Sequence, residues 1–159
     1  NDFECYNDFN SNLVNLYRCV RDNPNRLKYK LRYVLDSRED FEWIASLHKR
    51  GLFPRFRDYD RAAKFYQLVR YSYASGLDSF GSQPHSIWSD FPMIDMAARR
   101  LQKVVIENKD FEKLIRQYDR PVSFFYCDPP YFATENYYKD VGFTTKDHIR
   151  LRKTDREKR

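Results

Sequence analysis

Residues 122–131 read Val-Ser-Phe-Phe-Tyr-Cys-Asp-Pro-Pro-Tyr, and the prediction of the fold starts from this stretch. Its first six residues, 122–127, form an apolar run without a polar face, which is typical of a strand buried on both sides of a parallel sheet. The prolines that follow lack N–H donors and fix φ, so they end the strand. Ligands of such sheets bind just beyond the carboxyl ends of the strands. The sequence therefore predicts an α/β fold with a site at Asp128.

Residues 3–7 look like a short strand, and the apolar run at 104–106 predicts another strand of the same sheet. Apolar residues at helical spacing predict helices between these runs, and glycine, proline and serine favour a loop at 74–91. Strands that alternate with helices indicate a parallel sheet, into which an all-helical insertion at 37–100 is placed. The helices are expected from about residue 13 to Pro24, from Ser37 to Gly51, from about Arg61 to Tyr73, around 93–101, at 111–118 and from Thr144 to Leu151.

Length and composition limit the class of protein. The chain has 159 residues, of which 42% are hydrophobic and 18% aromatic, and this excludes a disordered chain and fits one domain. No apolar run approaches the roughly 18 residues that a membrane span needs. The three cysteines, Cys5, Cys19 and Cys127, lack metal-ligand spacing with the histidines, and no leader precedes them. We expect a soluble, cytoplasmic protein in a reducing setting, without zinc, another metal or disulfides.

The net charge of +6 is concentrated at the C-terminus. Residues 146–159 contain seven basic and three acidic side chains, a balance of +4, and residues 152–159 contain no apolar side chain. Such a block of like charge is typical of a solvated basic tail. Charge alone is therefore weak evidence for nucleic-acid binding.

The segment Asp128–Tyr131 has the groups that an exocyclic amine needs before it can attack a methyl group. The lone pair of such an amine is delocalised into the ring, so acceptors on its two hydrogens must draw it toward tetrahedral geometry. The Asp128 carboxylate can accept one hydrogen, the Pro129 carbonyl the other, and the Tyr131 ring offers a face for stacking. This chemistry requires neither a metal nor a covalent intermediate. The alternative is an aspartate that caps a turn closed by Pro129 and Pro130.

With this segment and several others, the chain resembles the Dam-like (D12 class) adenine-N6 DNA methyltransferases, which use S-adenosylmethionine. The resemblance makes Asp128, Pro129, Pro130 and Tyr131 the catalytic segment, with Asp128 also facing the cofactor. Residues 4–10 and 13–18 look like the second strand and helix of the family, which assigns Asp8 to the ribose hydroxyls of the cofactor.

Residues 106–112 are similar to the third-strand segment of the same family. This likeness implies that Asp110 accepts a hydrogen bond from the adenine amino group of the cofactor and that Phe111 packs on the adenine ring. An ordinary helix N-cap at Asp110 and a core position for Phe111 explain the same residues equally well.

The insertion at 37–100 resembles the target-recognition region of the family, and double-stranded DNA is then the expected partner. Arg55, Arg57 and Arg70 are candidate DNA contacts because guanidinium groups suit guanine edges and phosphates, although surface arginines are more often simply solvated. The resemblance also implies base flipping, since a methyl donor does not reach the amine inside a stacked duplex.

One part of the family pattern is missing. The chain has four glycines, where average usage gives about 11, and no G-x-G phosphate loop. The strand order implied by the resemblance is 3-2-1-4-5, in which the glycine-bearing loop follows a first strand expected before Asn1. The expectation is thus an incomplete Rossmann-like sheet, with residues 1–36 and 101–151 as a partial catalytic domain. Its central strands would expose their edges, and a missing N-terminal segment or a complementing chain would complete it.

Two other functions stay open at this point. The chain could be a catalytically inactive DNA-binding remnant, which would bind DNA in a salt-sensitive way without binding the cofactor. It could also be a methyltransferase that acts on another planar amine, such as an RNA base or a glutamine amide.

Overall fold

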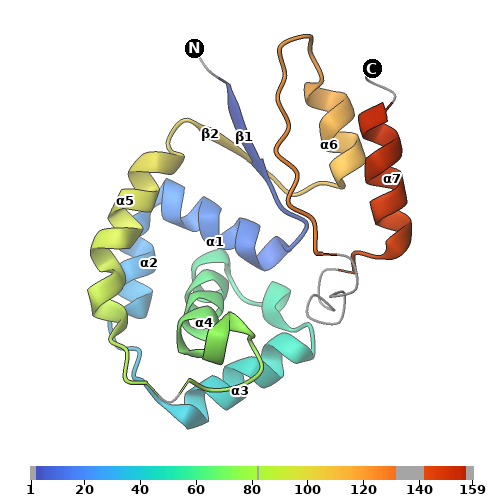
Figure 1. Cartoon of the computed structure of the whole chain (residues 1–159). Coiled ribbons are helices and arrows are strands. Elements are labelled where there is room, and N and C mark those ends of the chain that lie inside the picture. Colours follow the sequence, from blue (N-terminus) through green and yellow to red (C-terminus); the bar gives the residue numbers. More distant parts are fainter. Residues whose placement is uncertain (1–2, 82, 132–141, 157–159) are drawn as a thin grey trace. The chain divides into compact units, whose positions relative to one another are not determined.

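The structure is a computed structural model of the chain, and it describes residues 3–81, 83–131 and 142–156 (Figure 1). Most of the described residues are helical, and two short strands form a small sheet. The elements in chain order are β1 (Glu4–Asn7), α1 (Ser11–Asp22), α2 (Pro24–Leu31), α3 (Arg38–Lys49), η1 (Phe53–Arg55), α4 (Asp58–Tyr71), η2 (Tyr73–Ser75), η3 (Ile87–Asp90), α5 (Phe91–Leu101), β2 (Val104–Glu107), α6 (Phe111–Tyr118) and α7 (Thr145–Arg156).

By packing, the chain divides into two compact units. The first unit consists of Asn1–Tyr6 and Ser11–Ile106, and the second unit of Asn7–Asn10 and Glu107–Arg159. The first unit holds the whole predicted insertion together with α1 and α2, whereas the second holds every predicted catalytic and cofactor residue. The functional division into 1–36 with 101–151, 37–100 and 152–159 stays a prediction.

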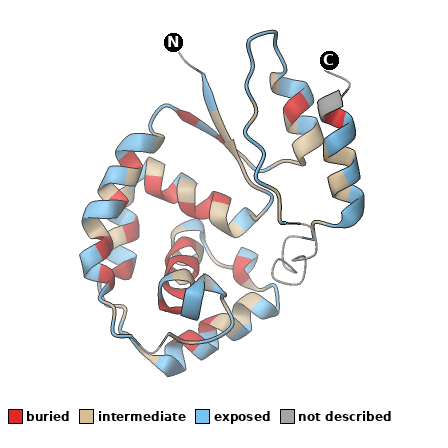
Figure 2. Cartoon of the chain, viewed as in Figure 1, coloured by how far each residue is buried: buried red, intermediate tan, exposed pale blue. Residues whose placement is uncertain are grey.

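The core of the first unit is built around α4. This helix contacts α1, α2 and α3 and carries seven buried residues, so that Figure 2 shows it largely buried. The large side chains that are fully buried come from several elements: Leu27, Leu31, Phe41, Phe53, Leu68 and Ile87. Burial of one such side chain contributes about 1.5–3 kcal/mol. The helices that carry or adjoin the predicted DNA-contacting arginines therefore pack against a substantial apolar core.

Capping residues explain where two of the helices begin. Ser37 Oγ accepts a hydrogen bond from the Asp40 backbone N–H at 3.2 Å, which confirms the predicted start of α3. Helix α2 was not predicted, because Pro24 was expected only to end the preceding helix. Proline suits the first turn of a helix, and Asn23 Oδ1 accepts from the Arg26 N–H at 2.9 Å, so the same proline also begins α2.

The two strands predicted at 3–7 and 104–106 are neighbours, as β1 and β2, and run in the same direction (Figure 1). One face of this parallel pair is covered by α1, whose Val14 is buried with Val104 and Ile106. Arg18 Nη2 of α1 also donates to the Ile106 carbonyl at 3.2 Å. The parallel pairing of these two segments confirms this part of the predicted sheet.

The predicted buried strand at 122–127 is wrong for this structure. Val122 lies in a turn and residues 123–127 form no strand, and Val122, Phe124 and Tyr126 are 93%, 87% and 82% exposed. An apolar run becomes a buried strand only when other strands bond to its edges, and the described part of the chain supplies none there. The expected gap in the sheet stays a prediction.

The last helix is longer than predicted. Thr144 N–H and Oγ1–H donate to Asp147 Oδ2 at 2.9 and 2.8 Å, which confirms the capping arrangement at its start. The helix continues to Arg156, so part of the predicted basic tail at 152–159 is helical, while residues 157–159 lie outside the described residues. None of the helices described is long and apolar enough to cross a membrane.

Candidate functional site

The side-chain amides of Asn7 and Asn108 form hydrogen bonds between the segment at the end of β1 and the segment that follows β2. Asn7 Nδ2 donates to the Lys109 carbonyl at 3.0 Å, and Asn7 Oδ1 accepts from the Lys109 N–H at 2.9 Å. Asn108 Nδ2 donates to the Asp8 carbonyl at 2.8 Å and to the Phe9 carbonyl at 3.2 Å. Two predicted cofactor residues, Asp8 and Asp110, are therefore held at the carboxyl edge of the same strand pair, where parallel sheets bind ligands.

The Asp8 carboxylate is half-buried and takes part in the local turn. Its Oδ1 accepts a hydrogen bond from the Asn10 backbone N–H at 2.7 Å, just before α1 begins. This bond fixes the carboxylate at the strand end. A carboxylate has acceptor sites for several donors.

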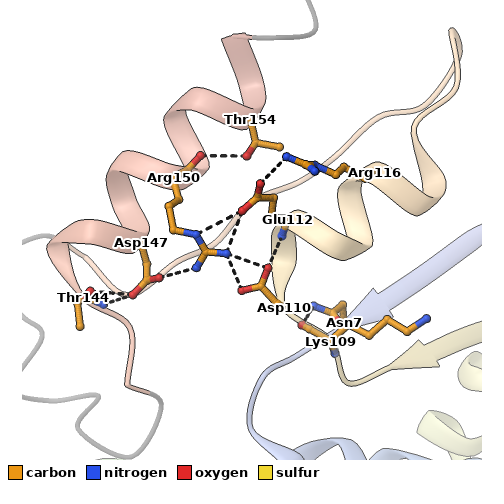
Figure 3. A network of polar contacts seen from close by, with 9 residues as sticks. All are labelled: Asn7, Lys109, Asp110, Glu112, Arg116, Thr144, Asp147, Arg150 and Thr154. Carbon is orange, nitrogen blue, oxygen red and sulfur yellow. Dashed lines mark hydrogen bonds and ion pairs between the residues drawn. The ribbon is translucent and has the colours of Figure 1, made fainter.

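Asp110 is the N-cap of α6, as its alternative interpretation required. Its Oδ1 accepts from the Glu112 N–H at 3.1 Å. It is also paired with Arg150 of α7, whose Nη2 lies 3.0 Å from each of its two carboxylate oxygens (Figure 3). The cap does not exclude the predicted role at the cofactor, and that role stays a prediction.

Phe111 begins α6 and lies between groups from the C-terminal part of the second unit. The Arg150 guanidinium carbon is 4.8 Å from its ring centroid, and the Phe143 ring centroid is 5.9 Å away. The ring is half-buried rather than part of a closed core. Its predicted role in stacking on the cofactor adenine stays a prediction.

The Asp128–Tyr131 segment belongs to the same unit as Asp8, Asp110 and Phe111. Asp128 is exposed, Pro129 and Pro130 are half-buried, and Tyr131 is 69% exposed. No metal-binding group of three or more His, Cys, Asp or Glu side chains exists among the residues that the structure describes. The acceptor oxygens of this segment are thus presented on the surface of the second unit.

The three candidate DNA-binding arginines all lie in the first unit but in different surroundings. Arg55 ends η1, Arg57 precedes α4, and both are exposed. Arg70, near the end of α4, instead forms two bonds with the buried Asp90: Nε to Oδ2 and Nη2 to Oδ1, each 2.9 Å. Its role as a DNA contact stays a prediction, but the structure gives its guanidinium a partner within the fold.

His85 completes this pairing and was not singled out in the sequence analysis. Its Nε2 lies 2.9 Å from Asp90 Oδ2, and its backbone N–H donates to Asp36 Oδ2 at 3.1 Å. The bond to Asp36 holds this segment against the chain before α3, while Arg70, whose Nη2 lies 3.0 Å from His85 Nε2, connects it to α4. The Arg70–Asp90 and Asp36–His85 contacts join residues 20 and 49 positions apart, so no local spacing predicts them.

Arg150, Asn7 and Asn108 are the polar residues of the site that the sequence analysis missed. Only Arg150 carried a usable signal, because it follows Asp147 by three residues on a predicted helix and its Nη1 donates to Asp147 Oδ1 at 2.8 Å. Asn7 and Asn108 each stand at a strand end, where asparagine is also an ordinary turn residue.

Comparison with known proteins gives this site its context. Residues 4–159 match the family model described as D12 class N6 adenine-specific DNA methyltransferase. The chain is also 28% identical, over 165 residues, to the Type II methyltransferase M1.LlaDCHI of Lactococcus lactis subsp. cremoris. That alignment covers 92% of this chain and 57% of the relative, so the chain spans little more than half of the relative's length. With the family model matched over nearly its whole length, the chain belongs to the D12 class of N6 adenine-specific DNA methyltransferases.

Proposed function

We propose that the chain carries the catalytic segment and the target-recognition region of a site-specific DNA adenine-N6 methyltransferase. The enzyme would transfer a methyl group from S-adenosylmethionine to the amino group of a flipped adenine. The observation that carries the proposal is the family match over residues 4–159, which includes Asp128-Pro-Pro-Tyr131 in a unit that also holds Asp8 and Asp110. The lactococcal relative, a Type II methyltransferase by name, suggests a restriction-modification setting.

The residues at the strand ends fit the cofactor by their chemistry. The ribose hydroxyls and the adenine amino group are hydrogen-bond donors, and Asp8 and Asp110 offer ionised acceptors at neighbouring strand ends. The half-buried Phe111 ring lies beside Asp110 and offers a stacking surface. When bound, the cofactor supplies an electrophilic methyl group on a sulfonium centre.

The catalytic segment prepares the target amine. Asp128 and the Pro129 carbonyl accept hydrogen bonds from its two hydrogens, and this draws the nitrogen lone pair out of the ring. Positive charge that develops on the nitrogen then lies beside the Asp128 carboxylate, and stabilisation of developing charge is a large part of many catalytic effects. Tyr131, with its exposed ring, stacks on the flipped base. The prolines restrict the backbone, so these acceptors are set before the substrate arrives.

We also infer that a segment outside these 159 residues completes the cofactor site. The chain contains no G-x-G loop, spans 57% of the lactococcal relative, and exposes the apolar run at 122–127. A complementing strand would cover that run and bring with it the glycine-bearing loop for the methionine end of the cofactor. The chain alone is then expected to bind the cofactor weakly and to turn over slowly or not at all.

Calorimetric titration of S-adenosylhomocysteine, together with a methylation assay on duplex DNA, tests this function. We expect weak binding to the chain alone, and tight binding with adenine-N6 methylation once the unmatched part of the lactococcal relative is supplied. Efficient methylation by the chain alone would overturn the need for a completing segment but not the catalytic assignment. Methylation of an RNA base or an amide, with none on DNA, would overturn the substrate.

A DNA-binding remnant is the second candidate, and the exposed 122–127 run favours it. A chain that has lost its sheet neighbours keeps the core of the first unit, with Arg55 and Arg57 on its surface. This function predicts salt-sensitive DNA binding that Asp128→Ala leaves unchanged, with no cofactor binding under any condition. The titration described above separates the two candidates.

The double variant Arg55→Ala/Arg57→Ala is expected to weaken binding to every duplex sequence to a similar degree. Each lost phosphate contact lowers the slope of log affinity against log salt concentration by about 1, so we expect a decrease of about 2. Fluorescence anisotropy of a labelled duplex at several salt concentrations measures this slope. The matched control is Arg99→Ala, an exposed arginine on α5, which should leave the slope unchanged. An unchanged slope in the double variant would remove Arg55 and Arg57 from the interface.

A further inference from the structure

We propose that Arg150 is a positioning residue for the cofactor, which holds Asp110 and Phe111 in their binding arrangement and makes that arrangement depend on α7. The inference rests on the proposed function, because it takes Asp110 and Phe111 as the adenine-binding pair. It adds a residue from a helix that neither the motifs nor the capping signals placed at the site.

The contacts of Arg150 are unusually numerous for a half-exposed arginine. Its guanidinium bonds to three carboxylates, of which Asp147 lies on its own helix and Asp110 and Glu112 lie at the start of α6 (Figure 3). Nη2 is 3.0 Å from Asp110 Oδ1 and Oδ2 and 3.0 Å from Glu112 Oε2, and Nη1 is 2.8 Å from Asp147 Oδ1. One cation thereby connects two helices through a charged network.

The orientation of the guanidinium bears directly on the ring beside Asp110. Its carbon lies over Phe111, 4.8 Å from the ring centroid, while its N–H groups reach the Asp110 carboxylate. Planar guanidinium groups stack on aromatic faces and donate at their edges at the same time. Arg150 therefore supports one face of the ring and fixes the adjacent carboxylate with a single rigid group.

The surrounding charges favour this arrangement. The three carboxylates raise the pKa of Arg150 further above its already high usual value, first through hydrogen bonding with Asp110. Hydrogen bonds from Thr144, and then from Arg150, lower the pKa of Asp147. Isolated exposed ion pairs contribute little to stability, but a network that orients several groups restricts their geometry. The expected effect is therefore on binding more than on global stability.

Arg150 connects segments that precede and follow the predicted catalytic segment in the chain. Asp110 and Phe111 follow β2, and α7 begins after the catalytic segment Asp128–Tyr131. Through Arg150, α7, which follows the catalytic segment in the chain, contacts the predicted adenine-binding pair, which precedes that segment. Cofactor binding and the seating of α7 are thus expected to favour each other, since both need the same conformation of Asp110 and Phe111.

The first test compares S-adenosylhomocysteine affinity in variants of Arg150. Arg150→Gln, which keeps a planar polar group but no charge, should weaken binding by about 10-fold or more, as loss of a group that orients a ligand typically does. Arg150→Lys keeps the positive charge but loses the planar guanidinium with its several N–H donors, so its affinity should lie between those of Arg150→Gln and the unaltered chain. Arg152→Gln on the same helix is the control, because Arg152 is exposed and should leave the affinity unchanged.

The second test needs no cofactor. Hydrogen exchange followed by mass spectrometry should show faster exchange at residues 112–118 and 145–154 in Arg150→Gln, with the first unit unchanged. Faster exchange over the whole chain would indicate a general loss of stability and would overturn the positioning role, as would unchanged exchange at α6. Unchanged affinity in Arg150→Gln would overturn the inference while the proposed function stands. Absence of cofactor binding in the unaltered, completed chain would instead contradict the proposed function.

Discussion

Replacing Asp128 with alanine is expected to reduce DNA adenine methylation by at least about 10³-fold, in any form of this enzyme that methylates DNA. Loss of one preorganised group that stabilises the developing charge costs about 10²–10³ in rate, and Asp128 serves both to activate the amine and to balance that charge. The Pro129 carbonyl alone leaves one amine hydrogen without an acceptor. Single-turnover methylation with a radiolabelled methyl donor measures this loss.

Two further variants test whether the loss of rate is due to the Asp128 carboxylate itself. Asp128→Asn keeps an oxygen acceptor but loses the charge, so its rate should lie between those of the alanine variant and the unaltered chain. Glu42→Ala, at an exposed acidic position on α3, should retain the full rate. Duplex binding should change much less than the rate in these proteins, because the candidate DNA-contacting arginines lie in the first unit and are unaltered. An alanine variant that methylates within 10-fold of the unaltered chain would exclude Asp128 from the chemistry.

Replacing Arg70 with alanine is expected to destabilise the first unit by about 2–4 kcal/mol. Removing one partner of a buried ion pair typically costs 3–5 kcal/mol, because the other charge stays buried without its partner. Here Asp90 is only 5% exposed, whereas the Arg70 side chain is 36% exposed and His85 remains beside the carboxylate. Because His85 is retained and water reaches Arg70, we expect the loss of unfolding free energy to lie near or below the lower end of the range of about 3–5 kcal/mol.

Urea denaturation followed by tryptophan fluorescence isolates this effect. Both tryptophans of the chain, Trp43 and Trp88, lie in the first unit, so their signal reports the unfolding of that unit. Arg55→Ala, at an exposed position, is the matched control and should change the free energy of unfolding by less than about 0.5 kcal/mol. If Arg70→Ala is as stable as this control but loses DNA affinity, Arg70 acts at the DNA and not in the fold.

The sequence predicted most of the local structure because the relevant signals lie close together along the chain. Ser37 with Asp40 and Thr144 with Asp147 are capping pairs three residues apart, and both helix starts were confirmed. Strands were predicted at 3–7 and 104–106, within one residue of β1 and β2 at each end, and their pairing followed from the resemblance. Family membership was confirmed by the match over residues 4–159.

Features that depend on distant partners were less predictable. The apolar run at 122–127 has the composition of a buried strand, but composition does not supply the neighbours that bury it. The Arg70–Asp90 pair joins residues 20 positions apart, and the Arg150–Asp110 pair joins residues 40 apart. Neither follows a helical or strand repeat, so no spacing rule predicts it. The roles of Asp8, Asp110 and Asp128 stay predictions that the experiments above address.

The paired bonds of Asn7 with Lys109 have a consequence for the alignment of the two strands. Backbone ladders of short strands tolerate a shift by one residue, and such a shift turns every side chain to the opposite face. The Asn7 amide matches the backbone of Lys109 through one donor and one acceptor, an arrangement that a shifted alignment would break. The Asn7 side chain thus fixes the register of two four-residue strands. It keeps the residues that follow the two strands, Asp8 and Asp110 among them, in a fixed alignment.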